Sequence, residues 1–94
     1  MFIATLKFAD RSRASQLMEG HNSWLRRGFD DGVFLLAGSL QPGLGGVILA
    51  HNLSKADLEA RVLEDPFVAE GVVTAEILDI APARADERLA FLKG

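Results

Sequence analysis

Two hydrophobic periods alternate along this chain, and their order limits the fold more than any other feature of the sequence. Residues 2–8 place apolar side chains on one side at every second position, which is the period of a β-strand. From Ser12 to about residue 30, apolar residues recur at steps of three and four, which is the period of an amphipathic helix. Gly32 then offers the left-handed conformation that often follows a helix. The chain therefore begins with a strand and a long helix.

A predicted hairpin and a second helix follow. Residues 33–40 and 46–51 are apolar runs, and the segment Gln41-Pro42-Gly43-Leu44-Gly45 between them has the turn chemistry of a hairpin loop. Ser54 precedes a second amphipathic run, where its hydroxyl can cap the free backbone donors of a helix. We expect the buried stripe of this helix to consist of Leu58, Val62 and Leu63.

The stretch Asp65-Pro66-Phe67 must end that helix. Proline cannot continue a helix, and it pushes the preceding Asp65 out of the α region. Phe67 offers a large apolar anchor that would hold this carboxylate against the core. Residues 72–80 are predicted to form a fourth strand, and residues 84–94 a short C-terminal tail whose docking the sequence does not determine.

The order of these elements predicts an α+β fold of the ferredoxin-like βαββαβ type, an antiparallel sheet with two helices on one face. We expect residues 1–94 to form a single domain. The strands at 33–40 and 46–51 are apolar on both faces, so the second face of the sheet needs a cover. The simplest cover is the same face of a second copy in a two-fold homodimer, and the alternative is the tail.

Charge and composition argue against several classes of partner. The net charge of -3 arises from 10 basic and 13 acidic residues without long runs, which predicts no nucleic-acid binding. The sequence offers neither a membrane-spanning apolar run nor the layout of a signal peptide, so we expect a cytoplasmic protein that does not bind membranes. Without cysteine there is no thiolate nucleophile, and the two histidines show no metal-ligand spacing. We expect neither a metal ion nor an organic cofactor.

His21 is the most informative single position. It lies within the apolar stripe of the first helix, three or four residues from Leu17, Met18, Trp24 and Leu25. A buried imidazole needs a partner, and Asp65 is a plausible one, although sequence spacing alone does not show contact. Such a carboxylate would fix the ring tautomer and leave the other nitrogen free to act as a general base. The alternative is a core histidine whose hydrogen bonds are satisfied, and the residues alone leave both interpretations open.

Other polar and aromatic residues are weaker candidates. Ser39 could present a hydroxyl to a ligand, but it lacks the strand-turn-helix context of a nucleophile. Trp24 and Phe67 are candidate substrate-binding residues beside His21, although Trp24 also suits the core. The glycines of the hairpin do not open a helix, so we interpret them as turn residues rather than a phosphate-binding loop: Gly43, Gly45 and Gly46.

The chain resembles the YCII-related domain family, small proteins of the dimeric α+β barrel kind, over nearly its whole length. The resemblance is most specific at His21 with Trp24-Leu25, and at Asp65-Pro66-Phe67 followed by Gly71. Leu36-Ala37-Gly38-Ser39 matches a more general pattern, and Leu40 stands where the family commonly has proline. The resemblance implies that His21 and Asp65 form an active-site dyad.

The same resemblance implies a type of chemistry. Related enzymes include chloromuconolactone dehalogenases, which are similar to muconolactone isomerases and remove HCl from a lactone by proton abstraction. The implied function is a cofactor-independent lyase, dehydrochlorinase or isomerase acting on a small lactone or organic acid, with Ser39 helping to bind oxygen atoms. A non-catalytic small-ligand-binding or assembly module and a cofactor-free monooxygenase remain alternatives. The expected partners are a small molecule and further copies of the chain, as a homodimer or a higher oligomer.

Overall fold

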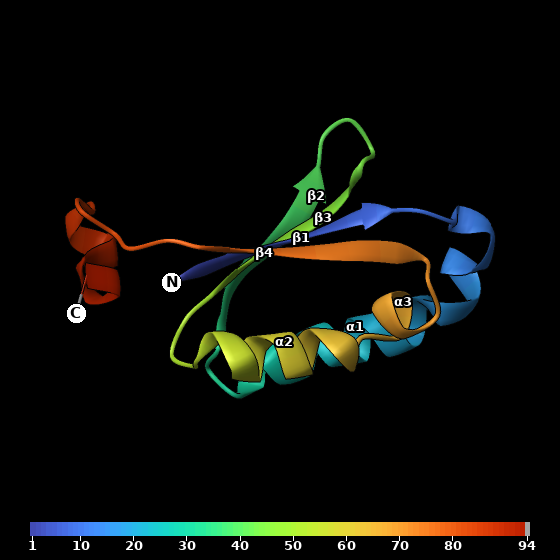
Figure 1. Cartoon of the computed structure of the whole chain (residues 1–94), viewed down its shortest axis with the longest axis horizontal. Helices are drawn as coiled ribbons and strands as arrows, with labels where there is room; N and C mark the ends of the chain where they lie inside the picture. Colours follow the sequence, from blue (N-terminus) through green and yellow to red (C-terminus); the bar gives the residue numbers. More distant parts are fainter. Residues whose placement is uncertain (94) are drawn as a thin grey trace.

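A computed structural model describes residues 1–93 as one four-stranded antiparallel sheet with helices gathered on one of its faces (Figure 1). The strands stand in the order β2-β3-β1-β4. This arrangement confirms the predicted α+β, ferredoxin-like fold. Along the chain the elements are β1 (Phe2–Phe8), η1 (Arg11–Arg13), α1 (Ala14–Asp30), β2 (Phe34–Leu40), β3 (Gly45–Ala50), α2 (Lys55–Leu63), α3 (Pro66–Ala69), β4 (Val73–Asp79) and η2 (Glu87–Lys93).

The core lies between the inner face of the sheet and the helices. Strand pairing sets the inner rows, because residues that pair across neighbouring strands point to the same face. In one row Ala4 pairs with Ile48 and with Ile77. Trp24 of α1 packs edge-on against Phe34 of β2, with ring centroids 5.2 Å apart. The buried hydrophobic residues are Phe2, Ala4, Leu6, Trp24, Val33, Phe34, Ile48, Ala50, Leu58, Val62, Phe67, Val72 and Val73.

The first helix has a different start from the predicted one. Arg11–Arg13 form a single 3-10 turn, and α1 begins only at Ala14. Asp10 caps this turn by accepting hydrogen bonds from the hydroxyl and the backbone N–H of Ser12 at 2.6 and 2.9 Å. These hydrogen bonds hold the pKa of Asp10 below its usual value. At the other end Gly32 has φ +73°, which confirms the predicted left-handed residue after the helix.

The second helix is followed by a short third one that the sequence did not predict. Ser54 caps α2 by accepting a hydrogen bond from the N–H of Asp57 at 3.0 Å, as expected. The helix ends at Leu63, whose side chain is 67% exposed, so its assignment to the buried stripe was wrong. The buried stripe ends with Val62, because the next position lies about a quarter turn around the helix and faces solvent. Pro66 then occupies the first turn of α3, where a missing N–H costs nothing.

The outer face of the sheet carries an apolar row that no other segment of residues 1–93 covers. Leu36, Leu49, Ile3 and Leu78 pair in register across all four strands. Leu36 and Leu78 at the two edges are 51% and 44% exposed. The tail leaves the end of β4 and stands away from this face (Figure 1), with the ring of Phe91 5.6 Å from that of His51. The tail therefore does not cover the outer face of the sheet, which was one of the two covers considered from the sequence.

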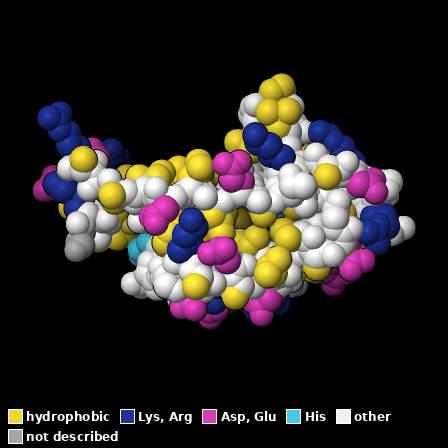
Figure 2. All heavy atoms as spheres, in the orientation of Figure 1, with side chains coloured by type: hydrophobic (Ala, Val, Ile, Leu, Met, Phe, Trp, Pro, Cys, Tyr) yellow, Lys and Arg dark blue, Asp and Glu magenta, His cyan; other side chains and the backbone are white. Residues whose placement is uncertain are grey.

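Helices and sheet part slightly at one edge of the molecule. Figure 2 shows hydrophobic side chains within a hollow of the visible face, with charged side chains beside it. A shallow groove of about 410 Å³ lies between α2 and the edge strand β4, with Lys55 and Glu59 among its lining residues. In residues 1–93 we find no helix with the length and apolar character that crossing a membrane requires.

The close packing of α1 on β2 leads to a first prediction. Gly28 is buried, and a Cβ at this position would overlap the ring of Phe34. Although alanine is normally better than glycine in a helix, Gly28→Ala should lower the free energy of unfolding by about 1–3 kcal/mol through overpacking. Urea unfolding followed by circular dichroism measures this change. Ser15→Ala, at an exposed position of the same helix, is the control and should change stability little. A more stable Gly28→Ala protein would contradict this packing.

Candidate functional site

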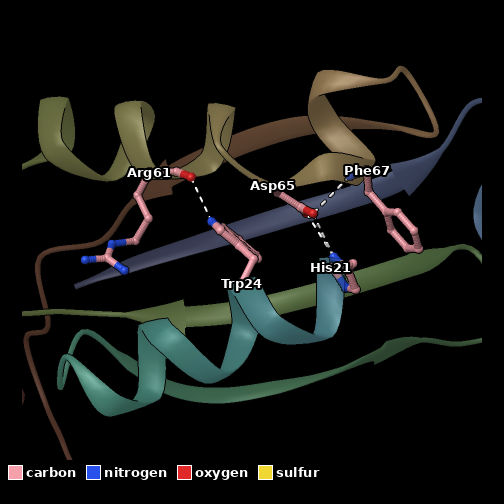
Figure 3. Close-up of polar contacts among 5 residues, drawn as sticks. All are labelled: His21, Trp24, Arg61, Asp65 and Phe67. Carbon is pink, nitrogen blue, oxygen red and sulfur yellow. Dashed lines mark hydrogen bonds and ion pairs between the residues drawn. The ribbon is translucent and has the colours of Figure 1, made fainter. Parts of the chain in front are cut away.

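Asp65 is a fully buried carboxylate at the junction of α2 and α3. Its backbone is extended, with φ -66° and ψ 122°, as the following proline requires. Oδ1 accepts a hydrogen bond from the N–H of Phe67 at 3.0 Å and so caps α3. The side chain is 0% exposed. The following proline and the hydrogen bond from Phe67 thus fix the position of Asp65. Its carboxylate oxygens point toward α1 (Figure 3).

His21 of α1 meets this carboxylate. Nδ1 of the ring lies 2.9 Å from Oδ1 and 3.0 Å from Oδ2 of Asp65 (Figure 3). An ionised carboxylate can only accept hydrogen bonds, so Nδ1 carries the proton and donates it toward Asp65. The imidazole side chain is 13% exposed. The structure therefore brings together the two residues that lie 44 positions apart in the sequence.

Aromatic packing fixes the plane of the imidazole. Phe67 stacks on the His21 ring with centroids 4.2 Å apart and an angle of 5° between the planes. Trp24 lies one turn along α1, with its ring centroid 6.0 Å from that of His21. The indole Nε1–H of Trp24 donates to the backbone oxygen of Arg61 at 2.9 Å, which ties α1 to α2 (Figure 3). The ring of His21 is therefore held by a hydrogen bond at one edge and a stacked ring on one side.

A cavity of about 360 Å³ opens between α1 and the inner face of the sheet, and His21 is part of its wall. Because Nδ1 is engaged by Asp65, Nε2 is the ring nitrogen that a molecule in the cavity can reach. Ser39 lines the same cavity from β2, and Asn22 lines it from α1. Most of the remaining wall is apolar or backbone, with side chains that include Leu6, Phe8, Met18, Leu25, Ile48 and Phe67.

The remaining predicted residues lie in different places. Trp24 is buried beside His21 and is not among the residues that line this cavity, so its contacts are those of the core. Phe67 both lines the cavity and stacks on the imidazole. His51 lies near the tail, beside Phe91. No group of three or more His, Cys, Asp or Glu side chains within residues 1–93 is arranged to hold a metal ion.

Two glycine assignments need correction. Gly43 has a positive φ of 63° and lies in the turn of the hairpin, as expected. Gly45, with φ 142°, and Gly46 instead lie within β3, and both line the cavity. Gly46 pairs with Leu6 and Ser39. The error arose because a glycine next to a turn looks the same in sequence whether it belongs to the turn or to the strand.

Asn22 was also missed as a cavity residue. Its position directly after His21 in the sequence is a signal that could have identified it as a residue of the same cavity. Leu6 and Phe8 could have been anticipated as cavity residues, since the alternation in residues 2–8 already placed them on one face with the core.

This arrangement has the parts of a general-base site. An imidazole with a protonated Nδ1 has a free electron pair on Nε2, and the nearby carboxylate stabilises the cation that forms when Nε2 takes a proton. Within the described part of the chain, His21 is the only ion-pair partner of Asp65. Because both groups are shielded from water, their attraction is screened less than it would be on the surface.

Comparison with known proteins supports the fold. No family model matches the sequence, and no curated protein matches it either. Among solved structures, the chain is similar to 5-chloro-2-hydroxyhydroquinone dehydrochlorinase (TftG) from Burkholderia phenoliruptrix, determined in complex with 2,5-dihydroxybenzoquinone. The match has a TM-score of 0.62 and 13% sequence identity, and it covers 85% of this chain and 93% of the dehydrochlorinase chain. At this identity the likeness concerns the fold.

The contact between His21 and Asp65 predicts a specific proton position. In the wild type the neutral His21 ring should carry its proton on Nδ1, because Asp65 accepts from that nitrogen. Asp65→Asn removes the charged acceptor and should shift the ring toward the Nε2–H tautomer. Nitrogen-15 NMR of the ring nitrogens, recorded where the ring is neutral, distinguishes the two forms. His51 serves as the internal control and should not change. An unaltered His21 tautomer in Asp65→Asn would contradict this hydrogen bond.

Proposed function

We propose that this chain is a small-molecule lyase or isomerase of the YCII-related type, in which His21 is the general base. The observation that carries the proposal is the Nδ1 contact with the buried Asp65, on a ring that lines a cavity. The dehydrochlorinase activity of the similar structure supports the lyase reading. The substrate is a small organic molecule with a C–H bond next to a carbonyl group, which a polyhydroxylated aromatic ring has in its keto tautomer.

In the proposed reaction Nε2 of His21 removes the proton from that carbon. The electrons of the broken C–H bond form an enolate, whose negative charge develops on the carbonyl oxygen. Where the neighbouring carbon carries chlorine, the enolate expels chloride and a carbon–carbon double bond forms, so HCl is lost. Where it carries none, the proton returns at another carbon and the product is an isomer. Both outcomes need the same base, so one site serves either reaction.

Asp65 acts through the ring and not on the substrate. Its carboxylate holds Nδ1–H and stabilises the imidazolium that forms during proton transfer. Phe67 keeps the ring plane constant, which preserves the approach of Nε2 to the reacting carbon. Ser39 lines the cavity from the sheet, where its hydroxyl can donate to the developing enolate oxygen.

We also propose that a second copy of the chain covers the outer face of the sheet. The row Leu36, Leu49, Ile3 and Leu78 is apolar, in register and exposed at its edges. A two-fold axis through such a row would place each leucine against an equivalent apolar surface. The tail leaves this face open, which favours a homodimer over an intramolecular cover.

The role of His21 is tested by turnover of a candidate substrate, beginning with 5-chloro-2-hydroxyhydroquinone and a set of enolisable lactones. His21→Gln should lower kcat by at least about a hundredfold, because none of the other residues that line the cavity within residues 1–93 has a side chain that can act as a base. Chloride release or the ultraviolet spectrum of the product measures the rate, and His51→Gln is the matched control. Full activity of His21→Gln would refute the base. Oxygen consumption during turnover would favour a monooxygenase instead, and absence of turnover with specific ligand binding would favour a binding module.

The proposed dimer makes a separate prediction. Leu36→Glu places a charge in the apolar row and should convert a dimer into a monomer in sedimentation experiments, with little effect on folding because this side chain is 51% exposed. Leu63→Glu, at an exposed leucine on α2, should leave the mass unchanged. A wild-type protein that sediments as a monomer at all concentrations tested would be inconsistent with this interface.

A further inference from the structure

We propose that the C-terminal tail, residues 84–93, binds a second copy of this chain in the groove between α2 and β4. This inference rests on the homodimer proposed above and adds a contact within it that the outer face of the sheet does not provide. Both the tail and the groove carry apolar surface that a single chain leaves uncovered.

The tail carries large apolar side chains that its own body does not cover. Leu89 and Phe91 lie in η2 and are 44% and 54% exposed, and no residue described in η2 is buried. Figure 1 shows the tail beyond the end of β4, apart from the sheet and the helices. Its aromatic contact with the body is the one between Phe91 and His51. Large apolar side chains that are clustered and exposed in this way are typical of a surface that binds another molecule.

The groove offers a surface of matching character. It has a volume of about 410 Å³, and its lining side chains are apolar except for Lys55 and Glu59. Figure 2 shows apolar side chains exposed within a hollow of this face. No segment of residues 1–93 fills the groove, and Leu63 in its lining is 67% exposed. The apolar lining residues are Val62, Leu63, Val68, Ala75 and Ile77.

The register of the proposed dimer decides which tail arrives at the groove. A two-fold axis along the outer apolar row places Leu78 of one copy opposite Leu78 of the other and makes their β4 strands antiparallel. Each residue beyond position 78 in one copy then lies opposite the residue equally far before position 78 in the other. Residues 80–84 of the second copy therefore run over residues 76–72, toward the α3 end of the groove. The tail of the same chain leaves β4 in the opposite direction, away from α3 (Figure 1).

The tail is long enough to pass from the outer face to the groove. β4 is an edge strand with no neighbour on its far side among the described residues, so a segment can pass around it. Packed sheet layers lie about 10 Å apart. Residues 81–86 precede η2 and span about 20 Å when extended, which is enough to bring η2 of the second copy around this edge.

Charge supports this placement. A tail that enters at the α3 end brings the last turn of η2, which holds Lys93, toward Glu59 on α2. Neither side chain has an ion-pair partner within residues 1–93. Because the axis is two-fold, each tail fills the groove of the other copy, and the exchange fills both grooves in one dimer.

The sequence makes a direct test possible, because it contains no cysteine and one introduced cysteine can carry a spin label at a chosen place. Copies with a nitroxide on Ala90→Cys, in η2, are mixed in excess with nitrogen-15-labelled wild type. The amide signals of Val68 and Ala75 in the wild type should lose at least about half of their intensity, because the nitroxide of another copy lies in the groove. The same label on Ser15→Cys, at an exposed position of α1, should leave these signals unchanged.

Two variants test the contact from both sides. Phe91→Ser in the spin-labelled copies should restore most of the intensity, because it removes an apolar anchor of the tail. Leu63→Glu in the nitrogen-15-labelled copies should do the same by placing a charge in the groove. The mass should remain that of a dimer in both cases, because the outer apolar row still joins the copies.

The outcomes separate this inference from the alternatives and from the proposed dimer. Signal loss only when label and isotope are in the same chain would show that the tail folds back into its own groove, and would overturn the exchange. Signals that stay sharp in both arrangements, or equal signal loss from the Ser15→Cys label, would overturn it too. If Leu36→Glu leaves a dimer and the tail still broadens the groove signals of the other copy, the outer-face interface is wrong and the tail contact stands. If Leu36→Glu gives monomers but the wild-type groove signals never broaden, only the tail contact is removed.

Discussion

The hydrogen-bonded carboxylate of Asp65 is the interaction on which the rest of the site depends. It caps α3 through the N–H of Phe67 and holds Nδ1 of His21, so one side chain sets the position of two elements. Pro66 imposes the extended backbone of Asp65 and also starts α3, and its ring lies 3.1 Å from where a Cβ of Gly20 would be. Gly20 thereby lets α1 come close enough to α3 for His21 to reach the carboxylate.

A buried charge at this position is more than a helix cap requires. Asparagine or serine would cap α3 about as well without the cost of removing a charge from water, which is several kcal/mol for a buried ion. Asp65 offsets that cost with hydrogen bonds from the N–H of Phe67 and from the ring of His21. What the charge adds beyond the cap is a fixed tautomer and a stabilised imidazolium. These are the properties that the proposed general base requires.

The periodicity of the sequence was enough to predict the fold. It was not enough where a segment was too short to show a period, or where the role of a residue depended on its partners in neighbouring strands. The strands and the two long helices each span enough residues for a hydrophobic period to be visible. The helix ends at Ser54 and Gly32 could each be predicted from a single residue type. The four residues of α3 are about one turn, which gives no period. Gly45 and Gly46 could not be told from turn glycines until their strand partners on β1 and β2 were known. His21 and Asp65 were recognised as unusual residues one by one, but their contact depends on how two helices pack.

The two faces of the sheet can serve two purposes without interfering. The cavity lined by His21 and Gly46 faces the helices, whereas the apolar row of Leu36, Leu49, Ile3 and Leu78 faces outward. Along β3, Gly46 in the cavity wall and Leu49 in the outer row are three residues apart, or about 10 Å at the rise of a strand. A second copy on the outer row would stiffen the strands that bear Leu6, Gly46 and Ser39 without reaching into the cavity. Assembly through this face would therefore leave the cavity open to a small molecule while supporting the strands that form one of its walls.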